Sequence, residues 1–142
     1  MKKILSYIIV LIAFVSCGED ISRRDSAVFQ GVKDNAIWEG GNAVATLEVG
    51  NKMTISAVTL TEAMSLKIPK PTMMVDPRNE NSFITHVLGT SITPKASYVL
   101  TSDTDVFTYE TGIGAGDGEI VITEYDGDVI SGTFRYNAKN RD

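Results

Sequence analysis

Apolar and polar residues alternate in short runs along most of the chain, as in strands that bury one face. Residues 43–49 and 53–57 alternate in this way on the two sides of Gly50-Asn51-Lys52, so the sequence predicts a β-hairpin there. Residues 64–68 predict a further strand with one polar face. Beyond residue 28, no run shows the 3.6-residue spacing of an amphipathic helix.

The last predicted hairpin consists of residues 119–125 and 129–136 around Asp126-Gly127-Asp128. One register keeps apolar residues on one face and polar residues on the other. Its facing pairs are Tyr125 with Val129, Thr123 with Ser131, Ile122 with Gly132, Ile120 with Phe134, and Glu119 with Arg135. A slip of one residue would pair Ile120 with Thr133 and mix the two faces, so we expect the first register.

Turn and loop signals divide the rest of the chain. Asp34-Asn35 and residues 101–105 predict turns, and the glycines of residues 112–118 predict a pliable link. Residues 69–82 predict a loop or an insertion, because their prolines cannot donate to a strand ladder. Further strands are predicted over residues 83–88, 98–100 and 106–109. Many short strands joined by polar turns predict an all-β domain over residues 28–142, an antiparallel β-sandwich or partly open barrel.

The first 16 residues have the three-part pattern of an export signal. Lys2 and Lys3 supply positive charge, residues 4–15 are almost wholly apolar, and Ser16 is a small residue at the cleavage position. The apolar run is too short for a membrane span, which needs about 20 residues. We therefore expect residues 1–16 to be a signal peptide that is removed, and residues 17–27 to form a flexible tether.

The segment Phe14-Val15-Ser16-Cys17 resembles a bacterial lipoprotein lipobox, with Phe14 where Leu is usual. The resemblance implies cleavage between Ser16 and Cys17 and acylation of Cys17. The alternative is an ordinary secretory signal followed by a free thiol, which is a liability in an oxidising compartment. Because two or three acyl chains give stable anchoring, we expect the protein to be attached to a membrane through Cys17 without crossing it.

The residues after Cys17 bear on location. Gly18 stands where Asp would signal inner-membrane retention in enterobacterial lipoproteins, so we expect an outer-membrane protein. Glu19 and Asp20 resemble the short acidic surface-export motif of Bacteroidota lipoproteins, or they simply belong to a solvated tether. The sequence leaves the cell surface and the periplasmic face as alternatives.

Charge and cysteine content restrict the partners. The chain of 142 residues has a net charge of -5. Removal of the signal peptide would remove Lys2 and Lys3. The remaining chain would then have 11 of the 13 basic residues and all 18 acidic ones, which is a net charge of -7. Nucleic-acid binding needs clustered Lys and Arg, and the basic residues here are scattered. Cys17 is the only cysteine, so no internal disulfide can form.

Three segments occur in the order KASYVL (95–100), FTYETG (107–112) and GEIVITEYDGDVISGTFRYNA (118–138). Behind a lipoprotein signal, this order resembles a group of Bacteroidota lipoproteins known only as a domain of unknown function. The likeness extends from Val28 to Asn140. This chain differs from the family pattern at two places. Asp34-Asn35 stands where a turn glycine is usual, and residues 69–82 look like an addition. The likeness implies a fold class and a compartment, and no catalytic residue.

Acidic loop residues are the candidates for metal binding. Asp103 with Asp105, or Asp117 with Asp126 and Asp128, present the hard oxygen ligands that calcium prefers. Asp is also a favourable turn residue, and the DGD segment lacks the spacing of a calcium loop. We therefore expect no metal or other cofactor, and we retain these residues as calcium candidates.

Catalytic patterns are sparse. His86 is the only histidine and lies in an alternating run, so we expect a structural role for it. A zinc site would need a second His or Cys in reach. A glycosidase would need a carboxylate pair such as Asp103 and Glu110, whose separation the sequence does not define. No nucleophile elbow or phosphate-binding loop is present, and we expect a protein that is not an enzyme.

Aromatic and methionine residues offer two surfaces. Sugars could stack on the aromatic rings if these shared one exposed face; the rings are those of Trp38, Tyr98, Tyr109, Tyr125 and Tyr136. For Trp38 we expect core packing instead, because aromatic side chains dominate the cores of β-sandwiches. Two further residues, Met73 and Met74, lie in the 69–82 loop. They either fold back under the loop or form an interaction surface.

These expectations combine into one hypothesis about function. The chain is expected to be an outer-membrane lipoprotein whose domain binds, or associates structurally with, a protein or glycan that the sequence does not identify. The alternatives are a carbohydrate- or calcium-binding accessory module at the cell surface, and a small hydrolase.

Overall fold

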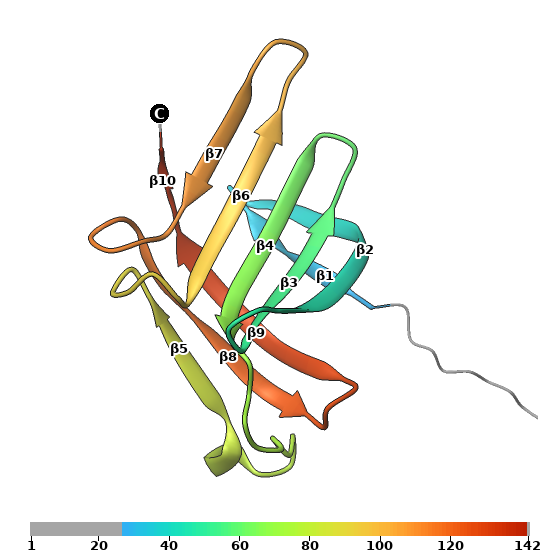
Figure 1. Ribbon diagram of the computed structural model, residues 1–142. Helices are drawn as coiled ribbons and strands as arrows, with labels where there is room; N and C mark the ends of the chain where they lie inside the picture. Colours follow the sequence, from blue (N-terminus) through green and yellow to red (C-terminus); the bar gives the residue numbers. More distant parts are fainter. Residues whose placement is uncertain (1–26, 142) are drawn as a thin grey trace, which may run out of the picture.

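The structure, a computed structural model, describes residues 27–141 (Figure 1). Strands dominate this range, and its only helical element is the 3-10 helix η1 (Glu80–Ser82). The strands are β1 (Phe29–Lys33), β2 (Ala36–Glu48), β3 (Lys52–Val58), β4 (Glu62–Pro69), β5 (Ile84–Leu88), β6 (Lys95–Thr101), β7 (Val106–Glu110), β8 (Asp117–Tyr125), β9 (Ile130–Asn137) and β10 (Lys139–Asn140).

The strands form two antiparallel sheets. The larger sheet has the order β1-β2-β3-β4-β6-β7-β10 and curls into a half-barrel, and the smaller sheet has the order β5-β8-β9 (Figure 1). Side chains from both sheets make one apolar core, so the smaller sheet packs on the inner face of the larger one. The predicted all-β antiparallel fold is confirmed, and the curled sheet gives it the form of a partly open barrel.

The chain passes between the two sheets at two informative places. β9 belongs to the smaller sheet, and after Ala138 the same stretch continues as β10, which pairs with β7 of the larger sheet. The segment between β4 and β5 makes the other passage. Along it, Val75 forms an isolated antiparallel bridge with Tyr125 at the end of β8. The two sheets are therefore tied by backbone pairing as well as by packing.

The early hairpins are confirmed. β1 and β2 are joined by Asp34 and Asn35, which both have positive φ (49° and 66°), the conformation of the two-residue turns that suit twisted hairpins. β2 and β3 are joined around Gly50, with Glu48 opposite Lys52. The predicted turn over residues 101–105 joins β6 to β7. The predicted link of residues 112–118 is shorter than expected, because β8 already begins at Asp117.

The predicted register of the last hairpin is confirmed in its middle and wrong near the turn. The structure pairs Glu119 with Arg135, Ile120 with Phe134, and Ile122 with Gly132. A bulge then shifts the register, so that Tyr125 pairs with Ile130 and Glu124 with Ser131. The cause lies in the turn. The Asp126 carboxylate accepts the backbone N–H of Val129 at 2.8 Å, which draws Val129 into the turn and makes Ile130 the first ladder residue.

The predicted alternation is confirmed on β4, where Met64, Leu66 and Ile68 are buried and the residues between them are not. It is wrong for the end of β2, where Ala45 and Leu47 are exposed, as is Val49 beyond it. Trp38 is buried, as predicted, and its ring meets that of Phe29 edge-on at 5.8 Å. The Phe29 ring in turn lies 5.1 Å from that of Phe134, so β1 packs on β9.

Gly40 makes room for this aromatic packing. A Cβ atom at Gly40 would lie 2.5 Å from the Cη2 atom of Trp38 and 2.6 Å from the Cβ of Ala57. Both neighbours are buried, so neither can move aside cheaply. A side chain larger than hydrogen cannot be accommodated here without displacing the core.

We expect Gly40→Ala to lower the free energy of unfolding by about 1–3 kcal/mol, because the added methyl overpacks the core. Urea unfolding measures the loss. Gly41→Ala is the matched control, since its Cβ would meet only the Val58 carbonyl oxygen at 3.7 Å, and we expect a change within about 0.5 kcal/mol. Equal losses in the two variants would contradict this account.

Candidate functional site

Four predicted site residues, Ser16, Cys17, Glu19 and Asp20, lie outside the described residues. Cleavage, acylation and surface export therefore stay predictions from the sequence. The other predicted residues can be located, and they lie at two ends of the domain. In Figure 1 the β3–β4 and β6–β7 turns lie at the top, the β8–β9 turn and the loop after β4 lie near the bottom, and the β2–β3 turn lies above these two, beside the lower end of β4.

Three segments meet in the lower half of the view in Figure 1 and form what we call the basal end. The Lys70 N–H donates to the Asn51 carbonyl at 2.9 Å, which ties the loop after β4 to the β2–β3 turn. Val75 and Tyr125 exchange backbone hydrogen bonds of 2.9 and 3.0 Å, which tie the same loop to the end of β8. The loop is therefore fixed to both neighbouring hairpins.

A hollow of about 160 Å³ lies between the β2–β3 and β8–β9 hairpins at this end. It is lined by Ala45, Leu47, Met53, Tyr125, Gly127, Asp128, Val129 and Ile130. Met53 and Tyr125 are buried, whereas Leu47 and Val129 stay largely exposed. The volume is below the range of about 300–1,000 Å³ that is typical of small-molecule sites.

Five exposed apolar residues lie in the segments that form this end, and two of them, Leu47 and Val129, line the hollow. We call these five residues the basal surface: Leu47, Val49, Met73, Met74 and Val129. Met73 and Met74 are 72% and 71% exposed, and their neighbour Val75 packs beneath the loop in their place. Of these five residues, the sequence pattern indicated only the two methionines. Val49 and Val129 each stand beside a turn signal, where a polar residue is usual, and this signal could have indicated them.

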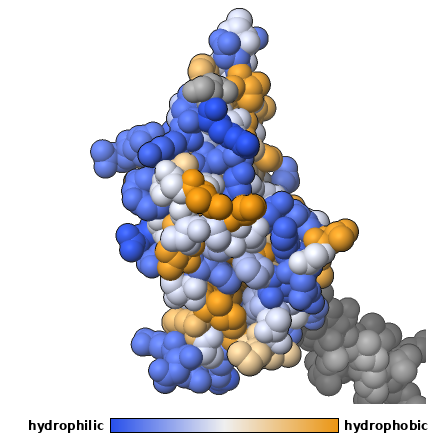
Figure 2. All heavy atoms as spheres, turned by 60° about the vertical axis from the view of Figure 1, so that its left-hand side comes forward, coloured by the Kyte–Doolittle hydropathy of each residue, from blue (hydrophilic) through white to orange (hydrophobic). Residues whose placement is uncertain are grey.

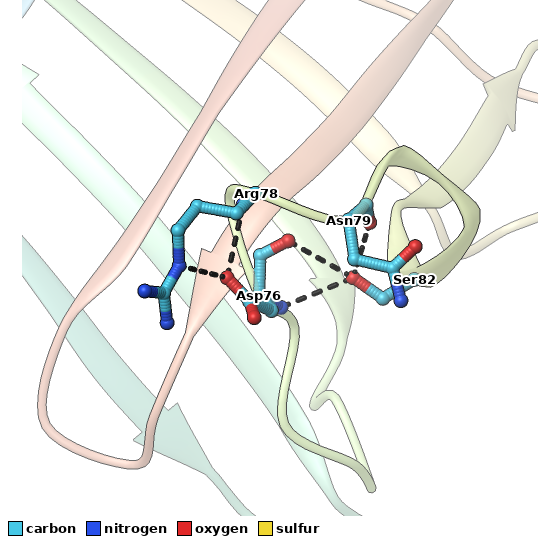
Figure 3. Close-up of polar contacts among 4 residues, drawn as sticks. All are labelled: Asp76, Arg78, Asn79 and Ser82. Atoms are coloured by element: carbon cyan, nitrogen blue, oxygen red, sulfur yellow. Dashed lines mark hydrogen bonds and ion pairs between the residues drawn. The ribbon is translucent and has the colours of Figure 1, made fainter.

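The second half of the same loop is held by its own polar contacts (Figure 3). The Ser82 hydroxyl donates to the Asn79 carbonyl at 2.7 Å and accepts the Asp76 N–H at 3.0 Å. Arg78 donates to the Asp76 carboxylate through its backbone N–H at 2.9 Å and through Nε at 3.2 Å. These donors hold the pKa of Asp76 below its ordinary value, the backbone N–H contributing most. The polar residues of the loop thus bond to one another.

The calcium candidates are not brought together. Asp103 and Asp105 belong to the β6–β7 turn, at the opposite end from Asp126 and Asp128 in the β8–β9 turn (Figure 1). Within residues 27–141, no group of three or more His, Cys, Asp or Glu side chains is arranged to hold a metal ion. The Asp126 carboxylate instead accepts the N–H groups of Val129 and Asp128, which hold its pKa below its ordinary value.

The third aspartate of that prediction, Asp117, accepts the side-chain amide of Asn137 at 2.7 Å across the β8–β9 pair. Of the glycosidase pair, Glu110 binds Lys95 at 2.8 Å and Arg141 at 2.7 Å. The hydrogen bond with Lys95 is the main reason why the pKa of Glu110 lies below its ordinary value. A general acid needs the opposite shift, so Glu110 is suited to pinning the end of the chain to β7.

A second polar cluster lies within the curled sheet. The Glu62 carboxylate of β4 accepts the Trp38 indole N–H at 2.8 Å and the Tyr98 hydroxyl. The Lys33 ammonium lies 4.7 Å from the centre of the Tyr98 ring. Burial raises the pKa of Tyr98, and burial raises that of Tyr136 to about 12, so both phenols stay neutral. One carboxylate thus joins β2, β4 and β6.

The aromatic rings do not form the sugar platform that the sequence left as an alternative to core packing. Trp38, Tyr98 and Tyr125 are buried, and Tyr109 and Tyr136 are partly buried against the core. Stacking on a sugar needs an exposed ring face, which the three buried rings lack.

His86 lies on β5 opposite Ile120, whose side chain is in the core. Its buried Nε2 atom has no hydrogen-bond partner among the described residues. Burial lowers the pKa of His86 from its ordinary value of 6.5, so the imidazole is neutral near pH 7. With no second titratable group bonded to it within residues 27–141, His86 lacks the orienting partner of a general base.

These features define a class, an antiparallel β domain in which several carboxylates support the fold and in which a group of exposed apolar residues lies at the basal end. The chain belongs to the family described as Domain of unknown function (DUF6252), whose model matches residues 25–142. The comparisons with curated proteins and with solved structures found no match. Among the described residues, no helix has the length and apolar character needed to span a membrane.

We expect Glu62→Ala to destabilise the domain by about 2 kcal/mol or more, because the Trp38 and Tyr98 donors lose their acceptor. Glu62→Gln keeps one carbonyl oxygen and should cost less. Urea unfolding followed by the fluorescence of Trp38, the only tryptophan, measures both variants. An alanine variant as stable as the glutamine variant would contradict the role of Glu62.

His86 should make stability depend on pH. Since its pKa is lower in the folded than in the unfolded state, the unfolded chain takes up the proton first as the pH falls below 6.5. Stability should therefore be fully present above that pH and decline below it. His86→Leu should flatten this decline below pH 6.5, measured by urea unfolding at each pH. An unchanged slope in His86→Leu would exclude His86 as its source.

Proposed function

We propose that this chain is an outer-membrane lipoprotein, anchored through acyl chains on Cys17, whose β domain acts by binding and not by catalysis. The observation that carries the anchor is the order of residues 1–17: two lysines, an apolar run too short to span a bilayer, a small residue and the only cysteine. Cys17 has no second cysteine in the chain with which to form a disulfide. Acylation of its thiol would account for its position directly after the apolar run.

A binding role is supported by how the described side chains are used. The carboxylates of Glu62, Asp76 and Asp126 accept hydrogen bonds that organise the fold. The basal surface, in contrast, leaves apolar side chains in water, where they contribute little to the core. Grouped apolar residues of this kind favour contact with another molecule.

The anchor is tested by growing cells with an alkyne analogue of palmitate. We expect the full-length chain to carry the label and Cys17→Ala to lack it, because no other cysteine can be acylated. The membrane fraction should contain the first protein and lose the second. Cys17→Ser is a closer control, since it keeps the size of the residue and removes only the sulfur.

The opposite result is equally clear. Label of equal strength on Cys17→Ala would place the acyl chains elsewhere and reject the anchor. Retention of the unlabelled variant in the membrane fraction would point to an uncleaved signal instead.

A further inference from the structure

The side chains of the basal surface come from the end of β2, from two turns and from the loop after β4. Val49 is 99% exposed, and Met73 and Met74 stand out from the loop after β4. On the face shown in Figure 2, apolar side chains emerge in several separate groups among hydrophilic ones. The basal surface differs from scattered exposure of this kind, because backbone hydrogen bonds join its three segments and two of its residues line one hollow.

The size of the basal surface limits what can cover it. Five exposed side chains offer a few hundred Å² of apolar area, which is short of the roughly 1,000 Å² of a stable protein interface. The hollow is too small for a typical ligand. A weak contact would suffice, however, if a tether kept its partner close, because tethering raises the effective concentration to the millimolar range.

The length of chain between Cys17 and the domain supplies such a tether. From Cys17 to Ala27 there are ten residue steps, which reach at most about 35 Å when extended. In Figure 1 the described chain begins at the right of the view, close to the height of the β2–β3 turn, which belongs to the basal end. A bilayer that holds the acyl chains is therefore within reach of the basal surface.

We propose that the basal surface lies on the bilayer that carries the anchor, with its apolar side chains in the boundary between headgroups and acyl chains. This inference rests on the proposed anchor. Leu, Val and Met side chains suit that boundary, and Lys52 and Lys70 beside the β2–β3 turn can extend their amines to headgroup phosphates. Asp126 and Asp128 adjoin Val129, and their charges limit how deeply this end can enter.

Methionine oxidation tests the contact. The chain beginning at Cys17 is coupled through its thiol to a maleimide lipid in vesicles of phosphatidylethanolamine and phosphatidylglycerol, or to a soluble maleimide of similar size. Peroxide then oxidises accessible methionines to sulfoxides, which mass spectrometry locates. We expect Met73 and Met74 to oxidise several-fold more slowly on vesicles. Met53 and Met64 are buried and should stay protected in both samples, which reports that the domain is folded.

Two variants make the test specific. Val49→Ser should restore part of the oxidation of Met73 and Met74 on vesicles, because it removes an apolar side chain from the same surface. Leu60→Ser is the matched control, since Leu60 is equally exposed but lies in the β3–β4 turn at the opposite end (Figure 1). It should leave the protection unchanged.

Equal oxidation of Met73 and Met74 on vesicles and in solution would overturn the inference and favour a protein partner for this surface. Protection lost equally in Val49→Ser and Leu60→Ser would also overturn it, because the contact would not be local. The coupling is chemical, so these outcomes do not depend on acylation in the cell. Failure of the labelling experiment and failure of this one can therefore be told apart.

Discussion

The curled seven-stranded sheet depends on the three-stranded sheet to bury its inner face. Ile68 on the large sheet and Ile120 and Ile122 on the small one are almost wholly buried together, and the Phe29–Phe134 ring contact joins the outermost strand, β1, to β9. An open half-barrel alone would leave this apolar face in water, at a cost of about 25 cal/mol for each Å². The stability of each sheet is therefore conditional on the other.

That dependence explains where the chain is irregular. Because β4 belongs to one sheet and β5 to the other, the chain between them must cross the basal end, and a segment rich in proline suits a crossing that joins no ladder. Val75 anchors the crossing through Tyr125, and the internal bonds of Asp76 and Ser82 shape the loop from there to η1. Met73 and Met74 lie just before this anchor, in a part of the crossing that belongs to no strand, and both are largely exposed. The exposure of these two side chains therefore results from the path of the chain as much as from the residue types in the loop.

Local patterns predicted the strands, the hairpins and the middle of the last register, because alternation and turn residues act over a few positions. They failed at Tyr125, where the side chain of Asp126 captured the N–H of Val129 and shifted the pairing. The two-residue strand β10 and the curl of the large sheet depend on packing between distant segments, which no local pattern encodes. For the same reason the sequence indicated Met73 and Met74 but not their neighbours Leu47, Val49 and Val129, which the fold brings to one end.

The acidic turn residues illustrate why composition alone misleads about function. Asp103, Asp105, Asp126 and Asp128 have the oxygen ligands of a calcium site, yet a site needs six to eight oxygens around one point. The hairpin topology sends the two pairs to opposite ends, and Asp126 directs its carboxylate to its own turn. A carboxylate that accepts backbone N–H groups in this way is already satisfied, and a cation would have to compete with the turn itself. The Asp126 carboxylate, which the sequence offers as a calcium ligand, is therefore used by its own turn.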